Sequence, residues 1–600
     1  MRMRIVYAIL ISVWTILLVR IYYLSIKSNE YYEEIAQNNA IKTELIAPVR
    51  GQVFDIKGNP LAVNRLGFSV SLKPHLRKDD KTLKDEIEAL ASTFTDLNST
   101  KLIKNYLKSD SPYNQEFVEV VEFIDYDAML PHFAKLSLRP NLLIKPASKR
   151  HYPYDYLASH VIGYVGRANQ KDIQTDELTK LTNYTGRSGI ERFYNSVLQG
   201  ASGERKTKVT ALNQEIEEIY YKGATSQDIK LTLDLELQKF VTEAFGKDAG
   251  AVVVMSLKDG AILAAGSFPE YNLNPFVTGI SQKEWDEIIK DLDKPFTNKL
   301  VNALYPPGSV VKMAMGMAFF NSGKIDPTTK IMCDPYFELG GRKFRNWKNY
   351  GYENMTIVEA IKESCDTYFY RGAYKVGIDD ISPVLEKFGF GVKSGIDLPN
   401  EYIGVVPSKE WKRTKTKEPW YQGDTLNTSI GQGSFLVTPV QVARDTAIFA
   451  TGLDVTPHFL HSIDENVTKW GVRDILSDKE KANLAYVRKG MYQTANIFGG
   501  TGFRALSSAN IRLGAKTGTA QVVGISQTDK NRINENDMKY YERSHAWITT
   551  YGPVEEPAFV VTAMVEHGGH GGSAAGPIVA KIYNKLIELG YIDKKYLKKK

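Results

Sequence analysis

The sequence of 600 residues is poor in cysteine, with only Cys333 and Cys365. Two cysteines exclude a fold built on a framework of disulfides, and they are too few to indicate a redox compartment. The two can pair if they lie close in space, which the sequence does not decide, and we expect two partly buried free thiols. The chain also lacks internal repeats and low-complexity segments, so its length predicts two or three ordinary globular domains.

The chain has little excess charge of either sign. Its 76 Lys and Arg residues stand against 69 Asp and Glu residues, which gives a formal net charge of +7. A surface that binds nucleic acid needs a concentrated excess of basic residues, so this balance favours no nucleic-acid partner. Five lysines cluster within residues 594–600. We interpret them as a solvated tail, with a role at a membrane surface as the alternative.

Long apolar runs are rare as well, and only one is long enough to span a membrane. Residues 5–19 are uncharged and mostly apolar, and residues 21–24 continue the run if Arg20 reaches the interface. Arg2 and Arg4 precede the run, which predicts a cytoplasmic N-terminus with the bulk of the chain outside. No small-residue cleavage pattern follows, so we expect an uncleaved anchor and not a signal peptide.

In the rest of the sequence, the pattern of expected strands and helices changes near Ser226. Before it, short strands and turn-forming glycines surround a charged stretch at 81–107 that reads as helical, and residues 30–40 are helical in character. After it, strands are expected at 229–234, 249–256, 261–266, 544–551 and 558–566, and helices at 235–245 and 576–589. A sheet built from both ends of one region, with helices between, is an α+β plan.

Ser309 and Lys312 form the sharpest local pattern. The segment Tyr305-Pro-Pro-Gly ends an extended stretch, and the residues from Ser309 to Phe320 read as a helix. Lys312 then lies one turn after Ser309 on the same face, where a lysine held neutral by burial can take the proton of a serine nucleophile. Alone, such a Ser-x-x-Lys quartet can occur by chance, and a serine that caps a helix is its usual explanation.

Two further segments carry candidate site residues. Ser364 and Asp366 can face a cleft while Tyr368 and Phe369 pack inside, although a turn that opens a helix explains them as well. The segment 511–523 is expected to form a strand that contains Gly518. A glycine within a strand is typical of a place where a ligand approaches the backbone closely. An ordinary edge strand is the alternative. In this segment, Lys516 and Thr517 can hold a carboxylate, and the Thr519 N–H can face a carbonyl oxygen.

Candidate metal ligands occur at two places in the sequence. His567 and His570 lie three residues apart, and Cys333, Asp334 and Cys365 are possible ligands near the second segment. Neither spacing demands a metal, so we predict no metal and no cofactor.

Taken in order, the three segments resemble the class B penicillin-binding proteins, for which serine–lysine, Ser-x-Asn-like and Lys-Thr-Gly motifs are characteristic. The likeness extends from Arg20 almost to the C-terminus and is strongest to the elongation-type members. Position 366 departs from the pattern, because many relatives carry Asn there. The further matching blocks are Pro48–Gly51 through Asp55, Gly186–Glu191, Thr232–Asp234, Asn427–Gly433 with Thr438 and Pro439, and Thr519–Gln521.

The resemblance implies a fold and three domains: a cytoplasmic tip and transmembrane anchor at 1–27, an elongated mixed α/β pedestal at 28–225, and a transpeptidase domain at 226–600. The last is expected to be an antiparallel sheet flanked by helices, as in penicillin-binding proteins and β-lactamases. The pedestal of the family does not polymerise glycan chains, so polymerisation is not expected of this chain.

The resemblance also implies an activity, a D,D-transpeptidase that cross-links stem peptides ending in D-Ala-D-Ala during elongation of the cell wall and binds β-lactams covalently. Ser309 is the nucleophile, Lys312 the base and Ser364 the proton relay. The backbone N–H groups of Ser309 and Thr519 form the oxyanion hole, and Lys516 and Thr517 hold the terminal carboxylate. The complete set of expected catalytic residues is Ser309, Lys312, Ser364, Asp366, Lys516, Thr517, Gly518 and Thr519.

The implied location is the bacterial inner membrane, with the catalytic domain in the periplasm. The implied partners are a SEDS-type glycosyltransferase and scaffold proteins of the elongation complex. Alternatives with the same motifs are a division-type transpeptidase and a serine β-lactamase or β-lactam sensor, although the sequence shows no clear Glu motif for deacylation. A non-catalytic scaffold is the third reading.

Overall fold

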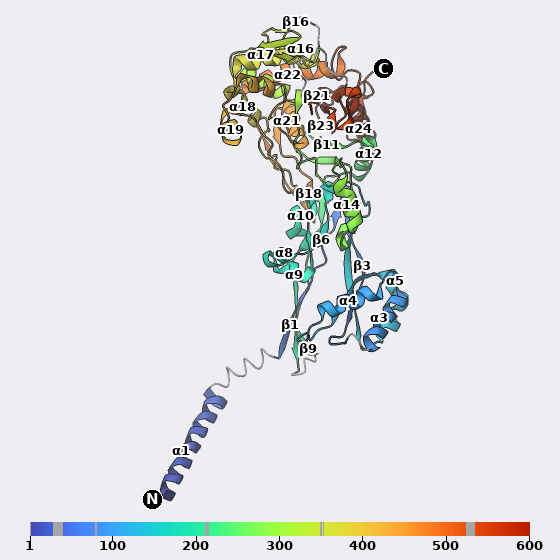
Figure 1. Ribbon diagram of the computed structural model, residues 1–600, viewed down its shortest axis with the longest axis vertical. Coiled ribbons are helices and arrows are strands. Elements are labelled where there is room, and N and C mark those ends of the chain that lie inside the picture. Colours follow the sequence, from blue (N-terminus) through green and yellow to red (C-terminus); the bar gives the residue numbers. More distant parts are fainter. Residues whose placement is uncertain are drawn as a thin grey trace. The chain divides into compact units, whose positions relative to one another are not determined.

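The computed structural model describes residues 2–27, 40–77, 81–210, 215–348, 351, 353–523 and 535–599 (Figure 1). The chain divides into two compact units. One consists of Met1–Arg50, Ala168–Tyr184 and Gln199–Ser226, and the other of Gly51–Arg167, Thr185–Leu198 and Gln227–Lys600. The expected domain boundaries at 27 and 225 stay predictions. The expected helix at 30–40 falls almost entirely on 28–39, outside the described residues.

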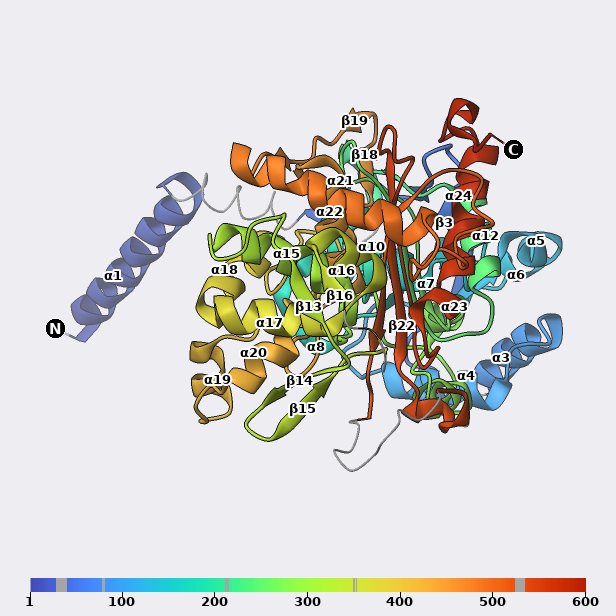
Figure 2. The same cartoon turned by 90° about the horizontal axis from the view of Figure 1, so that it is seen from above.

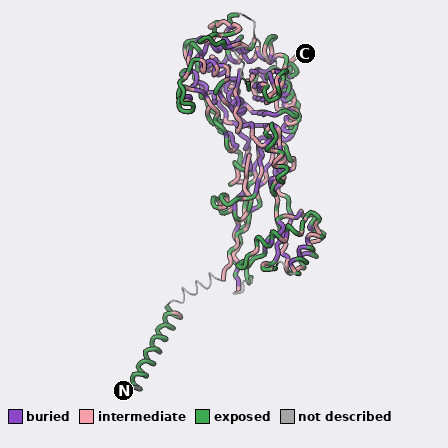
Figure 3. Tube along the Cα trace, viewed as in Figure 1, coloured by how far each residue is buried: buried purple, intermediate pink, exposed green. Residues whose placement is uncertain are grey.

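The first unit begins with the apolar helix α1 (Arg2–Tyr22), which continues as a π-helical turn, η1 (Tyr23–Lys27). Among the described residues, the helical segment Met3–Lys27 is the one that is long and apolar enough to cross a membrane, with a mean hydropathy of 2.2. Figure 3 shows α1 exposed along its length. An exposed apolar helix of this length suits a bilayer, so the segment is compatible with the expected single-pass anchor.

The same unit contains an antiparallel sheet of three strands in the order β1 (Ile41–Ile46), β8 (Gly203–Val209) and β9 (Glu215–Lys222). Arg205 on β8 forms ion pairs with Glu215 and Glu218 across the β8–β9 pairing. Cross-strand pairs of opposite charge help to set the register of such a ribbon.

In the second unit, the long strand β3 (Pro60–Leu72) pairs with β4 (Val118–Asp125) and β5 (Leu142–His151). Two helices, α3 (Lys81–Thr93) and α4 (Ser99–Ser109), pack on this sheet. The stretch 81–107, expected to be helical, thus contains two helices. Asn98 caps the second helix by accepting a hydrogen bond from the Lys101 N–H at 3.0 Å, which favours a new start over continuation.

Two of the sequence blocks that carried the family resemblance have structural roles here. Glu191 and Arg150 form a fully buried ion pair at 2.6 Å, and Arg150 also donates to the Gly51 carbonyl at 2.7 Å. A Cβ at Gly51 would lie 1.9 Å from the carbonyl oxygen of Gln227, so only glycine allows this close approach. These blocks join distant segments of the unit and lie outside the catalytic cavity described below.

The C-terminal part of the unit is built on a five-stranded antiparallel sheet in the order β12-β11-β23-β22-β21. The strands are β11 (Gly250–Ser256), β12 (Ile262–Phe268), β21 (Gly514–Ala520), β22 (His545–Gly552) and β23 (Phe559–Val565). The sheet thus draws strands from both ends of the region, as expected. Its strands are almost fully buried because helices cover both faces.

Helices α12 (Leu235–Phe245) and α24 (Gly576–Glu588) cover one face, and α21 (Pro439–Thr451) covers the other (Figure 2). As expected, Asp234 caps α12, its side chain accepting from the N–H groups of Glu236 and Leu237. The α+β plan, with an antiparallel sheet flanked by helices, is confirmed.

Beyond α21 lies the helical part of the domain: α15 (Lys312–Asn321), α16 (Ile357–Glu363), α17 (Asp366–Val376) and α22 (Asp478–Asn496). A small β-structure packs beside α17, formed by β13 (Ile331–Cys333), β16 (Glu353–Met355) and the hairpin of β14 (Tyr336–Leu339) with β15 (Arg342–Arg345).

The expectation of two free thiols is wrong, because Cys333 and Cys365 form a disulfide. The packing of β13 against α17 places their Cα atoms 6.3 Å apart, within the range that a disulfide spans. Two contacts hold the same segments together: Thr367 donates to the Asp334 carbonyl at 2.9 Å, and Arg371 pairs with the Asp334 carboxylate at 2.6 Å.

Replacing both cysteines by serine is expected to lower the free energy of unfolding of the domain by about 2–4 kcal/mol, because the crosslink closes a chain separation of 32 residues. Urea unfolding of the full-length protein in detergent measures the change. A reductant should reproduce the loss in the unsubstituted protein and have no effect on the double serine variant. Equal stability of the unsubstituted protein with and without reductant would contradict the prediction.

Candidate active site

The candidate nucleophile Ser309 lies in a 3-10 turn, η3 (Gly308–Val311), that leads directly into α15. Gly308 has a φ of +54° and donates its N–H to the Gly431 carbonyl at 2.9 Å. A Cβ at this position would lie 2.6 Å from the Thr519 carbonyl oxygen. Glycine is therefore required twice, for the left-handed backbone and for the close approach of the nucleophile turn to β21.

Lys312 lies on α15 with its side chain fully buried. Its Nζ donates to the Ser364 carbonyl at 2.8 Å, to Ser364 Oγ at 3.2 Å and to Asp366 Oδ1 at 2.6 Å. These three acceptors match the three N–H donors of an ammonium group. Burial lowers the pKa of Lys312, and the Asp366 carboxylate opposes that shift. A lysine whose pKa is lowered by burial is closer to the neutral form that a general base needs.

Ser364 ends α16 in the left-handed conformation, with a φ of +56°. This backbone turn places its hydroxyl between two lysines, because Oγ accepts from Lys312 Nζ at 3.2 Å and from Lys516 Nζ at 3.0 Å. With both lone pairs engaged, the remaining O–H is left to donate to a group in the cleft. A hydroxyl with this arrangement can pass a proton onward.

Asp366 begins α17, and both of its carboxylate oxygens accept hydrogen bonds. Oδ1 accepts from Lys312, and Oδ2 accepts from the Trp347 N–H at 3.0 Å. The Asp366 N–H donates in turn to Asn346 Oδ1 at 2.9 Å. An asparagine here would turn its NH₂ group toward one of two donors, so the local hydrogen bonding favours Asp over the Asn of many relatives.

Lys516 lies on β21 with its side chain fully buried. Its Nζ donates to Ser364 Oγ and to the Thr517 carbonyl at 2.8 Å. Burial first, and the charge of Lys312 second, lower the pKa of Lys516 well below its usual range. Two ammonium groups that share one hydroxyl disfavour each other's charge, so this pair favours loss of one proton.

Strand β21 is an edge strand that pairs only with β22, which leaves its other edge toward the cleft. The carbonyls of Thr517 and Thr519 both face that free edge, since they accept from Lys516 Nζ and from Gln432 Nε2 at 3.0 Å. In a strand the N–H and C=O of one residue point to the same side. The Thr519 N–H therefore also points to the cleft, where it can bind a developing oxyanion.

Gly518 lies between these residues with little room around it. A Cβ at Gly518 would be 3.0 Å from Val310 Cγ1 and 3.1 Å from the Pro307 carbonyl oxygen. The absence of a side chain thus lets the nucleophile turn pack on β21. The expectation that Gly518 also marks a close approach by ligand stays a prediction, because Gly518 lines the cavity described next.

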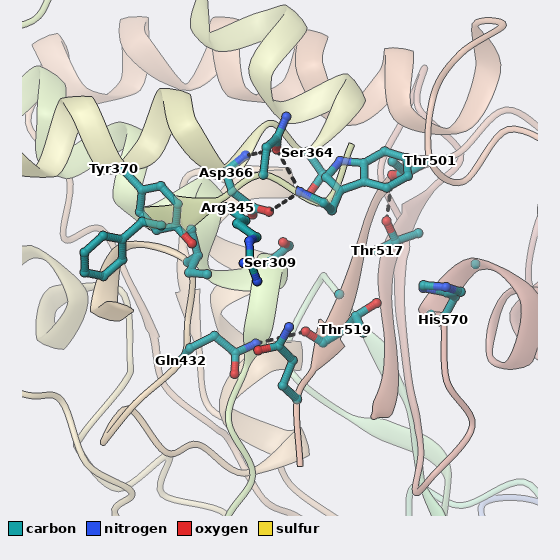
Figure 4. A pocket seen from close by; sticks show the side chains of 18 of the residues that line it. Ser309, Arg345, Ser364, Asp366, Tyr370, Gln432, Thr501, Thr517, Thr519 and His570 are labelled. Carbon is teal, nitrogen blue, oxygen red and sulfur yellow. Dashed lines mark hydrogen bonds between the residues drawn. The ribbon is translucent and has the colours of Figure 1, made fainter. Parts of the chain in front are cut away.

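The site residues meet around one cavity of about 680 Å³ (Figure 4). Six of the eight expected residues line it, and Lys312 and Lys516 lie buried behind its wall, hydrogen-bonded to Ser364. The structure thus brings all eight expected residues to one place. Their catalytic roles stay predictions. The six lining residues are Ser309, Ser364, Asp366, Thr517, Gly518 and Thr519.

Several residues at the site were not anticipated from the sequence. Asn346 and Trp347 hold Asp366, Gln432 binds the Thr519 carbonyl, and Thr501 shares a hydrogen bond of 2.6 Å with the Thr517 hydroxyl. These residues reach the site from three separate segments, and Asn346, Trp347 and Thr501 belong to no recognisable motif. The segment Asn427–Gly433, which the resemblance did single out, gave the one usable signal, for Gln432.

The candidate metal ligands near the second segment are engaged in other contacts. Cys333 and Cys365 are bonded to each other, and the Asp334 carboxylate pairs with Arg371. Among the residues that the structure describes, no group of three or more His, Cys, Asp or Glu side chains is arranged to hold a metal ion.

Comparison with known proteins agrees with this geometry. Residues 250–584 match the penicillin binding protein transpeptidase domain, and residues 45–231 match the penicillin-binding protein dimerisation domain. The chain is 34% identical to the peptidoglycan D,D-transpeptidase MrdA of Haemophilus influenzae over 95% of this chain and 89% of that one.

Solved structures show the same likeness. The chain superposes on penicillin-binding protein 2 in its complex with MreC from Helicobacter pylori with a TM-score of 0.85 and 41% identity, covering 92% of this chain and 99% of that one. A peptidoglycan synthase complex that coordinates polymerisation and crosslinking contains a chain with a TM-score of 0.70 and 27% identity, with 99% of both chains covered. With a transpeptidase model over more than half of its length and relatives along nearly all of it, this chain belongs to the penicillin-binding protein transpeptidase family.

Proposed function

We propose that this chain is a peptidoglycan D,D-transpeptidase of cell-wall elongation that works through an acyl-enzyme on Ser309. The observation that carries the proposal is the Ser364 hydroxyl, which receives hydrogen bonds from two buried lysines at the edge of the cavity that Ser309 lines. An acyl transfer needs a nucleophile, a base and a proton donor to the leaving group in one place, and these groups supply them.

In the proposed reaction, the neutral form of Lys312 takes the proton of Ser309 as Oγ attacks the carbonyl between the two D-alanines. Charge develops on the carbonyl oxygen, which the N–H groups of Ser309 and Thr519 bind. The tetrahedral intermediate then collapses, the bond to the terminal D-alanine breaks, and Ser364 passes the proton to the leaving amine. The acyl group stays on Ser309 until an amine of a second stem peptide attacks it.

Substrate orientation comes from the side of β21. The terminal carboxylate of the donor peptide binds at Thr517, whose hydroxyl is fixed by Thr501, with the Lys516 charge behind it. A carboxylate bound there supplies a negative charge near the two lysines, which favours the protonated form of one of them. The β-lactams, which carry a carboxylate beside a strained amide, acylate Ser309 in the same orientation.

The proposed location is supported by the apolar helix of the first unit, and the proposed partners are supported by the relatives. Arg2 and Arg4 precede the apolar run at 5–19, which supports a catalytic domain on the periplasmic side of the inner membrane. The H. pylori relative is described in complex with MreC, and another similar chain belongs to a synthase that polymerises and crosslinks. We infer that this chain likewise works beside a SEDS-type glycan polymerase and a scaffold of the elongation complex.

Mass spectrometry after treatment with benzylpenicillin is expected to find a single adduct, on Ser309. The Ser309→Ala variant should show none, because it lacks the hydroxyl that is proposed to attack the β-lactam carbonyl. Ser137→Ala is the control, because Ser137 is exposed and does not line the cavity. This variant should keep full labelling. An adduct on another residue, or release of the adduct within seconds, would contradict a transpeptidase assignment.

The Asp366→Asn variant is expected to shift the acidic limb of the pH–rate profile of acylation to lower pH. The carboxylate raises the pKa of Lys312 against the effect of burial, so its removal lowers that pKa and makes the neutral base available at lower pH. The maximal rate should fall about ten- to a hundredfold, because the amide cannot replace both acceptor bonds.

The rate constant for acylation by a fluorescent penicillin, measured over a pH series, tests this prediction. Asp380→Asn is the matched control, since Asp380 pairs with Lys324 at the surface and its loss should leave the profile in place. A limb that moves to higher pH in the Asp366 variant would show that the carboxylate does not raise the pKa of the base.

A further inference from the structure

The cavity wall carries more positive charge than the proposed reaction uses. Of the charged side chains among the described residues that line the cavity, four are cationic, Arg342, Lys343, Arg345 and Arg504, and the carboxylate is that of Asp366. That carboxylate is already bound by Lys312 and by the Trp347 N–H. The described lining thus has more cationic side chains than carboxylates, which favours a ligand with more than one negative group.

Three of these cations belong to one element, the β14–β15 hairpin. Phe344 on β15 is buried against Tyr370 and Leu426, which fixes that face of the ribbon to the domain. Adjacent residues on a strand point to opposite faces, so Arg345 points away from this apolar contact. Figure 4 shows the Arg345 side chain extending into the pocket toward Ser309, with Thr517 on the other side of the nucleophile.

The hairpin is also held firmly to the second catalytic segment. The residue after Arg345 is Asn346, which accepts from the Asp366 N–H, and the Trp347 N–H donates to the Asp366 carboxylate. At the other end, the Cys333–Cys365 disulfide ties the strand before the hairpin to the residue between Ser364 and Asp366. A guanidinium on such a fixed frame loses little entropy when it binds, which is the condition for a selective site.

We propose that Arg345, with Arg342 and Lys343 reinforcing its field, forms a subsite for a carboxylate that a substrate peptide carries away from its C-terminus. This subsite rests on the proposed function and adds a specificity element to it. The terminal carboxylate binds on the side of β21 at Thr517, so a guanidinium on the opposite side of Ser309 meets a different group of the substrate. The planar guanidinium forms two parallel hydrogen bonds to a carboxylate, which a neutral carboxamide cannot match.

The test compares two synthetic peptides that end in D-Ala-D-Ala and differ only in the preceding residue, whose side chain bears a carboxylate or the corresponding carboxamide. The release of D-alanine by the full-length protein in detergent gives kcat/KM for each. The unsubstituted protein is expected to prefer the carboxylate peptide on the order of tenfold, the effect of one charged hydrogen bond, and less at high salt. In Arg345→Gln the ratio should fall close to one.

A second arm identifies which substrate strand carries the recognised group. With one donor peptide held constant, acceptor amines with and without a nearby carboxylate compete with water for the acyl-enzyme. If the preference for a carboxylate depends on Arg345 in the release of D-alanine, the subsite binds the donor peptide. If it depends on Arg345 in the transfer to acceptor amines, the subsite binds the acceptor. Absence of an Arg345-dependent preference in both arms overturns the proposal.

Controls separate this result from a general loss of charge or fold. Arg413→Gln removes an exposed cation of α19 (Lys409–Lys415) that does not line the cavity, and it should keep the ratio of the unsubstituted protein. Arg345→Lys keeps the charge but loses the two parallel hydrogen bonds, so an intermediate ratio of the two kcat/KM values is expected. This variant replaces Arg345→Gln in the test if the Gln variant does not fold. Penicillin labelling of Ser309 in the unsubstituted protein tests the proposed function separately, since its failure would remove the reaction itself and not only the selectivity.

Discussion

Two lysine side chains are buried around one serine hydroxyl, and the rest of the catalytic domain is organised to hold them there. Lys312 and Lys516 both donate to Ser364 Oγ, and one carboxylate, that of Asp366, compensates the pair directly. Two positive charges in a buried position are costly, and the cost is reduced when one lysine is neutral. The electrostatic repulsion that disfavours full protonation thus favours a neutral lysine, the form that the proposed acyl transfer needs as its base.

The arrangement depends on segments that come from distant parts of the chain. Lys312 lies at the start of α15, Ser364 at the end of α16, and Lys516 on the edge strand β21. Helices on both faces bury the sheet, so β21 is rigid along its paired side and open only toward the cleft. Because the lysines are held by packing on either side of Ser364, their geometry exists before a substrate arrives, which is the basis of electrostatic preorganisation.

Residues outside the proposed catalytic set also help to position the site. The small β-structure at 331–355 contacts Asp366 through Asn346 and Trp347, and the disulfide fixes it to the residue between Ser364 and Asp366. Its presence explains the aspartate at 366, since both carboxylate oxygens meet donors. In the other half of the unit, the buried pair of Arg150 and Glu191 shows that a family-specific sequence block can serve folding and not chemistry.

The sequence by itself determined the elements and the candidate residues. The strands at both ends of the catalytic region, the Asp234 cap and the serine–lysine spacing follow from local patterns of side-chain polarity and capping, which act over a few residues. Tertiary structure alone decided the Cys333–Cys365 disulfide and the recruitment of Asn346, Trp347, Thr501 and Gln432 to the site. Their contacts join residues far apart in the chain, and no local pattern records which distant segment a hydrogen bond or a thiol will meet once the core has packed.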